Sequence, residues 1–568
     1  MPYKCDLASS DSRPLPLIVG RAPRRKRVLV GGLALVALLA IGYAILLRVT
    51  RVEPPPISVE ERTRAELPLE ARGPRAYVGP SWMGRERGVW EIHLEGEPYQ
   101  MGWAHSRLGQ QMHLVQEEYL FNEFERYVPS SLARWGIKLL VRVGYRKLAD
   151  FIPLPRKEEL AGEAAASVDL HADFLPIYQR LVYYHSLHDI TQGVEHSPLL
   201  GCSAFAASGA ATPGGHLIIG RNFDFEGPEP FDRDKAVIFF REKGRIPLVS
   251  VAWAGMGGVV TGINAEGVFV SINAARTEDK GGVGMPVEIL VREILGQAHN
   301  LEDVVRLVRE TPIMVPDFYL VGDGKTGESI VIERSPKRTE VRRAVGSVSL
   351  LTNHALSPAF ASDAENDRLR RYLTSGARYR RLEELVRKHR GTIDARRALE
   401  ILRDKHGQSG EQLGLGNRNA LDAIIATHSV VIDATTMTLW VGTGPHLLGR
   451  FVGFDLRHEL LGEDHPTPAD LPADPIAESD DLRAYQEALR HLAAATKLAA
   501  LAPERAIEEL ERAAALQDHM PEPQRLLGDA RKKRGDVEGA RKAYRRFLEL
   551  FPPYLKDVEE VKGLLGTL

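Results

Sequence analysis

Cysteine is scarce in this sequence, which contains only Cys5 and Cys202 among its 568 residues. Two cysteines cannot form a disulfide framework, and their spacing offers no Cys-x-x-Cys metal site. An excess of positive charge is also lacking, because 74 lysines and arginines are balanced by 76 aspartates and glutamates. No basic stretch is interleaved with aromatic residues, so the sequence does not indicate a protein that binds nucleic acid.

Sequence motifs of several large enzyme classes are missing as well. The chain has no Gly-x-Ser-x-Gly, P-loop or His-Glu-x-x-His sequence, which argues against a serine-hydrolase elbow, a nucleotide loop and a zinc protease. The glycines within 281–284 lack the strand-to-helix context of a dinucleotide site, and we expect a loop near a substrate mouth there. We therefore expect no metal and no other cofactor.

One long apolar segment lies near the N-terminus. Residues 28–47 carry no charge, and as a helix rising about 1.5 Å per residue they would span about 30 Å, the hydrocarbon thickness of a bilayer. The basic run 24–27 makes the first flank the more positive one, which predicts a cytoplasmic tail of residues 1–27 and an extracytoplasmic catalytic part. A cleaved signal peptide is the alternative, but its apolar core is usually shorter and ends in small residues. We expect an uncleaved transmembrane helix, with Cys5 and Cys202 on opposite sides.

The remaining chain divides by composition. Residues 51–80 and 464–481 are rich in proline and charge and are predicted to be linkers. Residues 81–201 begin with a predicted strand at 89–94 and continue with predicted helices at 99–127, 132–151 and 175–188. Residues 202–463 alternate short β-rich runs with helical segments at 286–298, 301–310 and 377–405. This order favours an α+β fold in which two sheets pack between helical layers.

Residues 482–568 are predicted to be helical. Gly528, Ala540, Tyr544 and Pro552 match the small, small, aromatic and proline positions of a 34-residue tetratricopeptide unit, and a weaker unit precedes it. A generic helical hairpin is the alternative. Because fewer than three such repeats are marginal alone, we expect this region to pack on the catalytic domain or to bind a protein partner.

The stretch from Leu200 to Gly227 contains the main candidate catalytic residues. A short strand from Cys202, a glycine-rich turn at 212–215 and a second strand predict a β-hairpin. Its turn would return Arg221 and Asp224 to the side of Cys202. An arginine there would favour the thiolate by lowering the thiol pKa, and a carboxylate could hold and orient a neighbouring amine.

This hairpin resembles the N-terminal-nucleophile (Ntn) hydrolases of the choloylglycine hydrolase and penicillin V acylase group. The similarity is greatest to the acyl-coenzyme A:isopenicillin N acyltransferase-like subfamily, which is related to acid ceramidase, and it covers about residues 85–450. The Gly-Cys…Gly-Arg-Asn-x-Asp pattern is its most specific part. Weaker matches support it at residues 96–102, 264–273, 351–354 and 427–433. The resemblance implies an αββα sandwich.

The resemblance also implies residue roles. Cys202 corresponds to the nucleophile, with its own α-amine as the base. Arg221 corresponds to the arginine near the sulfur, and Asp224 to the carboxylate that binds the α-amine. Because Cys202 is internal, its amine is held in the Gly201–Cys202 peptide bond. The mechanism therefore predicts self-cleavage of that bond.

Three further positions follow from the same resemblance. Asn273 and Asn353 correspond to the two asparagines of the oxyanion hole, and Arg418 is the best match to a late arginine. An α-amine with a pKa near 7.7–8.0 can act as a base at neutral pH, and the thiolate would form an acyl-enzyme. The implied substrate is a small amphipathic linear amide, such as an N-acyl amino acid or an N-acyl lipid.

Two alternatives stay open from the residues alone. The first is a Cys-His dyad, for which four histidines are available: His196, His216, His354 and His428. The second is an inactive hydrolase-like scaffold whose C-terminal repeats bind a protein partner. The joint presence of the nucleophile, the arginine, the carboxylate and both asparagines argues against the scaffold.

Overall fold

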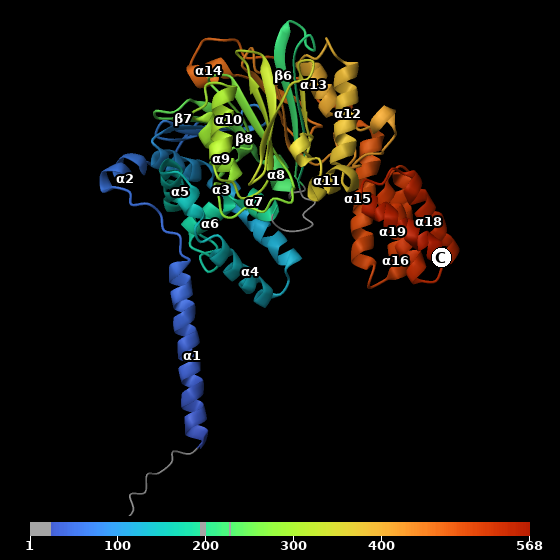
Figure 1. The fold of residues 1–568 in the computed structure, drawn as a ribbon, viewed down its shortest axis with the longest axis horizontal. Helices are drawn as coiled ribbons and strands as arrows, with labels where there is room; N and C mark the ends of the chain where they lie inside the picture. The colour runs from blue at the N-terminus through green and yellow to red at the C-terminus, as the bar shows by residue number, and fades with distance from the viewer. Residues whose placement is uncertain (1–23, 193–199, 226–228) are drawn as a thin grey trace, which may run out of the picture. The chain divides into compact units, whose positions relative to one another are not determined.

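The computed structural model describes residues 24–192, 200–225 and 229–568 (Figure 1). The chain divides into two compact units, Met1–Arg51 and Val52–Leu568. The described part of the first unit is helix α1 (Arg24–Val49), whose window Gly32–Val49 has a mean hydropathy of 2.3 and is not buried. By length and composition it is the one helix of the described residues that could cross a membrane, and the apolar segment predicted at 28–47 lies within it. Cys5 lies outside the described residues.

The second unit is built around two sheets. The larger sheet, here sheet A, has eleven strands, and β4 and β7 are its parallel neighbours while the other pairs run antiparallel. In spatial order its strands are β1 (Glu70–Arg72), β2 (Arg75–Val78), β3 (Ser81–Gly84), β4 (Trp90–Gly96), β7 (Lys235–Glu242), β8 (Leu248–Trp253), β9 (Thr261–Asn264), β10 (Val268–Ala274), β11 (Asp317–Asp323), β12 (Glu328–Arg334) and β13 (Thr339–Arg343).

The smaller sheet, sheet B, has six antiparallel strands. Its spatial order is β14 (Val348–Leu351), β5 (Leu200–Gly209), β6 (Gly215–Phe225), β15 (Ala426–Asp433), β16 (Thr438–Gly442) and β17 (Phe451–Asp455). One apolar cluster fills the space between the two sheets, with Ala204 and Ile219 from sheet B and Phe239 and Val251 from sheet A. Strands buried on both faces need continuous apolar sequence, which is why these runs were recognisable.

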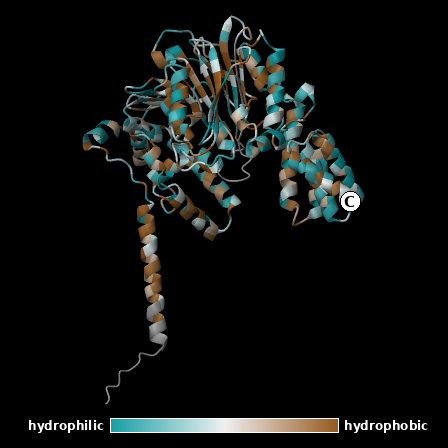
Figure 2. Cartoon of the chain, viewed as in Figure 1, coloured by the Kyte–Doolittle hydropathy of each residue, from teal (hydrophilic) through white to brown (hydrophobic). Residues whose placement is uncertain are grey.

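Helices cover the outer face of each sheet (Figure 1). On sheet A, helices α3 (Pro98–Tyr127), α9 (Val287–Leu295) and α10 (Leu301–Glu310) join one core cluster with the strands. On sheet B, helices α12 (Ser375–Lys388) and α13 (Ala395–Leu402) form another. The unit is therefore mixed α/β, with layers in the order helix, sheet, sheet, helix. Figure 2 shows hydrophobic residues concentrated in the strands and hydrophilic residues on the outer helices.

Beside sheet A, two helices pack closely against each other. Helix α3 contacts α5 (Leu154–Ala166) through a glycine on each side. A Cβ on Gly102 would overlap the carbonyl oxygen of Glu159, and one on Gly162 would overlap that of Tyr99. Only glycine permits this approach of the two backbones. Further helices before sheet B's last strands are α4 (Ser131–Gly144), α6 (Ile177–Tyr184), α7 (Leu187–Gln192), α8 (Glu229–Arg233) and α11 (Ala364–Tyr372).

The C-terminal region is helical, as predicted. Helix α14 (Leu456–Leu461) precedes it, and its own helices are α15 (Asp480–Leu498), α16 (Pro503–Leu516), α17 (Pro521–Lys533), α18 (Val537–Glu549) and α19 (Leu555–Thr567). Helices α15 and α16 pack as one pair and α17 and α18 as another. Their core also contains Leu415, Ile424 and Leu448 of the preceding region, so the helices pack on the body of the unit. Their identity as tetratricopeptide repeats stays a prediction.

Some sequence predictions were wrong in detail. The expected linker 51–80 contains helix α2 (Val59–Ala65) and strands β1 and β2. These strands are short and lie at the edge of the sheet, and β1 is exposed, so they lack the apolar alternation of a half-buried strand. The helix expected over 377–405 is two helices, because Gly391 adopts φ +87 and turns the chain between them. Strand β17 was not predicted.

Candidate active site

The predicted hairpin is formed by β5 and β6. Its register pairs Cys202 with Phe223, Gly201 with Asp224 and Ala204 with Arg221. The turn between the strands uses Gly214 and Gly215 at φ +68 and +77, a conformation that other residues rarely adopt. Strand β14 lies on the other side of β5, so that Asn353, two residues after its end, also reaches Cys202.

The Cys202 thiol is buried, with 2% of the residue exposed. Arg221 Nη2 donates to Sγ at 4.0 Å, a long contact. Burial raises the pKa of the thiol above its ordinary value, and the guanidiniums of Arg221 and Arg378 lower it in part. In the intact chain the thiol is therefore kept largely protonated, with a cation ready to stabilise the thiolate.

Arg221 is itself fixed by several acceptors. It donates to the Ile272 carbonyl and to the Thr261 hydroxyl, and Nη1 lies 3.2 Å from Nε2 of His428. His428 stacks on Phe223, with ring centroids 4.9 Å apart. Burial, and then the charge of Arg221, hold the pKa of His428 well below its ordinary value, so this imidazole is neutral. It orients the arginine and does not contribute charge.

Asn353 and Arg378 hold the backbone on either side of the thiol. The Cys202 N–H donates to Asn353 Oδ1 at 3.1 Å, and Arg378 Nη2 donates to the same oxygen at 2.8 Å. Arg378 Nη1 donates to the Cys202 carbonyl at 2.5 Å and to Ser203 Oγ at 2.9 Å. Arg378 lies on α12, and no sequence motif pointed to it.

The two predicted asparagines lie next to each other. Asn273 Nδ2 donates to the Thr352 carbonyl at 2.8 Å, and Asn353 Nδ2 donates to the Ala274 carbonyl at 2.8 Å. These reciprocal bonds tie the end of β10 to the chain that follows β14. Each amide nitrogen carries a second N–H, which could donate to a negative oxygen.

Asp224 lies opposite Gly201, beside the peptide bond that precedes the nucleophile. Burial raises the pKa of its carboxyl to about 7, although Arg378 and Arg418 lower it. Its Oδ1 is buried and has no hydrogen-bond partner within the described residues. An amine placed here would supply the missing donor.

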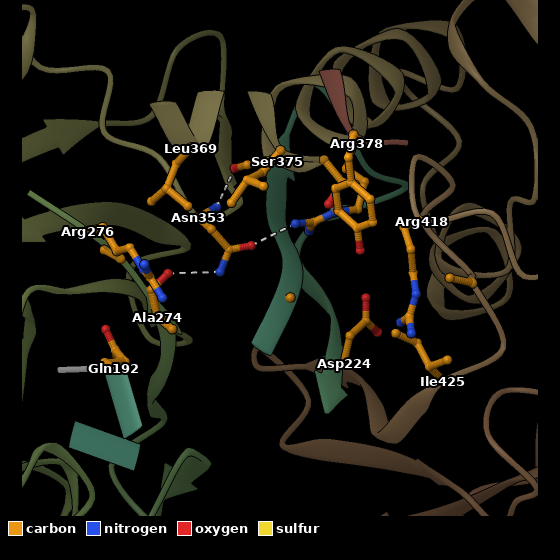
Figure 3. Close-up of a pocket in the computed structure, with 16 residues that line it drawn as sticks. Gln192, Asp224, Ala274, Arg276, Asn353, Leu369, Ser375, Arg378, Arg418 and Ile425 are labelled. Atoms are coloured by element: carbon orange, nitrogen blue, oxygen red, sulfur yellow. Dashed lines mark hydrogen bonds between the residues drawn. The ribbon is translucent and has the colours of Figure 1, made fainter. Parts of the chain in front are cut away.

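An open pocket lies over this cluster. In Figure 3, Asp224, Arg418 and Ile425 lie on one side of it, Gln192, Arg276 and Ala274 lie on the other, and Asn353 is between them. Gly201 lines the pocket, whereas Cys202 does not, so the thiol lies behind the preceding residue. The structure thus brings all six predicted residues to one place, and Arg378, which was not predicted, donates to the residues around the thiol.

The histidines of the alternative dyad are engaged elsewhere. His216 Nδ1 lies 2.8 Å from Asp433 Oδ2, and His354 Nδ1 lies 2.8 Å from Ser375 Oγ. Within the described residues no histidine hydrogen-bonds the sulfur of Cys202. His196 lies outside the described residues.

Part of the chain is similar to a known family. Residues 211–443 match the family described as acyl-coenzyme A:6-aminopenicillanic acid acyl-transferase. This part of the chain is similar to that acyl-transferase family. The matched residues include Arg221, Asp224, Asn273, Asn353 and Arg418, while Cys202 lies nine residues before the match begins.

The chain is also similar to several curated proteins. It is 24% identical over 443 residues to an uncharacterized protein of Archaeoglobus fulgidus, covering 70% of this chain and 69% of that one. It is 26% identical over 223 residues to an N-acylethanolamine-hydrolyzing acid amidase of Caenorhabditis elegans, covering 38% of this chain and 59% of the amidase. The chain thus spans less than two thirds of the amidase. A match to acid ceramidase of Bos taurus is 23% identical over 152 residues, 22% of this chain and 38% of that one.

Solved structures resemble the chain more distantly. The Caenorhabditis elegans amidase ortholog has a TM-score of 0.30 at 18% identity and covers 41% of this chain and 93% of that chain. Penicillin V acylase from Agrobacterium tumefaciens has a TM-score of 0.33 at 12% identity and covers 45% and 86%. By the family match and the relatives' names, the chain is related to amide hydrolases and acyl-transferases.

Proposed function

We propose that the protein is a membrane-anchored, self-processing cysteine amidohydrolase or acyl-transferase. It would cleave a linear amide, such as an N-acyl amino acid or an N-acyl lipid, through an acyl-enzyme. The observation that carries this proposal is the arrangement at the start of β5: Asp224 faces Gly201, Arg221 contacts the thiol, and Asn353 accepts from the N–H of Cys202. These groups surround the backbone nitrogen of Cys202. That nitrogen can act as a base only after the Gly201–Cys202 peptide bond is cut and it becomes an amine.

Processing would begin with attack of Cys202 Sγ on the carbonyl carbon of Gly201. The C–N bond of Gly201–Cys202 breaks, the nitrogen takes the thiol proton, and a thioester joins Gly201 to the sulfur. Water then hydrolyses the thioester and leaves a carboxylate on Gly201 and a free thiol and α-amine on Cys202. The burial of the thiol behind Gly201 supports this order, because removal of that residue would expose the sulfur to the pocket.

Catalysis would use the same sulfur again. The α-amine takes the thiol proton, and the thiolate attacks the amide carbonyl of the substrate. The second N–H groups of Asn273 and Asn353 would stabilise the tetrahedral oxyanion, for which loss of one donor typically costs a factor of about 10²–10³ in rate. Asp224 would hold the α-amine. The leaving amine takes the proton from the α-ammonium, and water or another amine then accepts the acyl group.

The membrane assignment depends on α1. Its length, composition and preceding basic run favour an uncleaved anchor with a cytoplasmic N-terminus and an extracytoplasmic catalytic part. Extraction of cell membranes tests it: we expect full-length or N-terminal material to stay in the membrane after washing with alkaline carbonate. Release of mature protein that begins after residue 47 would identify a cleaved signal peptide instead.

Purified full-length protein tests the proposed chemistry directly. We expect two fragments on a denaturing gel, with Edman sequencing of the C-terminal fragment beginning at Cys202. Cys202→Ala should remain a single chain and hydrolyse no amide, whereas Cys5→Ala, the matched control, should be processed normally. Active wild-type protein that keeps an unbroken backbone contradicts the proposal. A single chain without activity after long incubation favours the inactive scaffold.

A further inference from the structure

Helix α4 presents its apolar side to solvent. Leu132 and Leu140 are each 73% exposed, and Val143 is also exposed. Together with Gly136, these residues recur at intervals of three or four, so they form one stripe along the helix, here the α4 stripe. A Cβ on Gly136 would meet nothing within 4 Å, which agrees with an outward position. A helix on the surface of a soluble protein normally turns its apolar stripe toward the core.

The polar side of α4 faces the rest of the second unit instead. Arg134 Nη1 donates to the carbonyls of Val128 and Pro129, each at 3.0 Å. Lys138 Nζ donates to the Asp173 carbonyl, also at 3.0 Å. The helix lies away from both sheets (Figure 1), with charged groups toward the protein and apolar groups toward the outside. Single exposed apolar residues are ordinary, whereas a continuous apolar stripe marks a surface that contacts a partner or a membrane.

The charge around the α4 stripe suits a phospholipid surface. Residues 131–149 contain five lysines and arginines and neither aspartate nor glutamate. Helices that lie in a membrane interface combine an apolar face with lysines and arginines, and they are attracted to anionic lipids. This attraction acts over a Debye length, so it does not require each charge to contact a head group. Both features of α4 therefore favour a bilayer that contains anionic phospholipid.

The chain connects this part of the second unit closely to α1. Val52 lies three residues after the last residue of α1, and it is buried in an apolar cluster of the second unit. Val141 and Tyr145, at the end of α4, pack against the same cluster. Three residues of extended chain span at most about 11 Å. If α1 crosses a bilayer, the cluster against which α4 packs therefore begins close to the membrane surface.

We propose that the α4 stripe lies in the interface of a phospholipid bilayer, so that the catalytic unit is held on the membrane surface and not merely tethered through α1. This inference rests on the membrane anchoring in the proposed function and adds a second contact to it. A helix of this kind buries its apolar face about 5–10 Å into the boundary between head groups and acyl chains. The α4 stripe would thus be covered by lipid in the cell.

A fluorescent label on the α4 stripe tests the contact. The uncleaved full-length chain with Cys5→Ser and Cys202→Ala receives Leu140→Cys, is labelled with an environment-sensitive fluorophore, and is reconstituted in vesicles of phosphatidylcholine and phosphatidylglycerol. We expect lipids with a nitroxide near the top of the acyl chain to quench the label strongly, and lipids with the nitroxide near the chain end to quench it less. Val345→Cys, in the exposed turn between β13 and β14, is the matched control and should lose little fluorescence.

Each other outcome contradicts the proposal. A label at Leu140→Cys that no lipid nitroxide quenches overturns it, and so does equal quenching at the control position. Without such quenching, an emission shift that grows with protein concentration would identify a second copy of the chain as the occupant. If α1 proves to be a cleaved signal peptide, the labelled mature protein is mixed with the same vesicles. Quenching there still supports the lipid contact although the anchor has failed, and its absence refutes the contact separately.

Discussion

Replacement of Asp224 by asparagine should change how stability depends on pH. Asp224 is buried, and its pKa is raised from 3.8 to about 7. The folded chain therefore holds this proton more tightly than the unfolded chain does. Its stabilising contribution is complete below about pH 4 and is lost as pH rises through about 7. At 1.36 kcal/mol per pH unit, the loss is about 4 kcal/mol in the free energy of unfolding.

The measurement is thermal unfolding of the uncleaved Cys202→Ala chain, with and without Asp224→Asn, from pH 4 to pH 8. For a folded unit of about 500 residues, 4 kcal/mol corresponds to about 4 °C in Tm. We expect Tm of the asparagine variant to rise by about that much relative to its parent as pH increases. A Tm difference that does not vary with pH refutes the reasoning. In processed wild-type protein the new ammonium beside Asp224 should lower its pKa and shrink the effect.

Two further substitutions test the packing and the site. Gly102→Ala drives a methyl group into a carbonyl of α5 and should cost about 3 kcal/mol of unfolding free energy, whereas Gly136→Ala, with nothing within 4 Å, should be neutral or gain about 0.5–1 kcal/mol in denaturant titrations. Arg378→Met removes the donors to Asn353 and to the backbone at the cleavage site, so the fragment that begins at residue 202 should appear at least about tenfold more slowly. Arg380→Met, on the same helix but exposed, should process at the normal rate.

The local part of the site could be predicted because it is one hairpin. Cys202, Arg221 and Asp224 lie within 23 residues, and a glycine-rich turn between two apolar runs allows few geometries. Arg378 could not be predicted, because its contact with Cys202 joins residues 176 positions apart and comes from a helix without a motif. Arg418 was expected to be near the site and lines its pocket, but its position depends on packing against the C-terminal helices.

In the fold, too, local patterns could be predicted and contacts between distant residues could not. Helix α10 was predicted with its observed bounds, since a strongly amphipathic helix has a clear pattern. Strands β1 and β2 were missed because an edge strand is specified by its pairing partner rather than by its own composition. The close approach of α3 and α5 depends on two glycines far apart in the sequence, which no local pattern connects.

The pairing of β4 with β7 becomes a contact between two polypeptides if the chain is cut before Cys202. These two strands run parallel, with partners from Trp90 opposite Ala236 to Gly96 opposite Glu242. After the cut, β4 belongs to one polypeptide and β7 to another, so a continuous sheet becomes the interface of a heterodimer. The catalytic polypeptide would then have no covalent link to α1, and only loss of the fold would release it from the polypeptide that carries this helix.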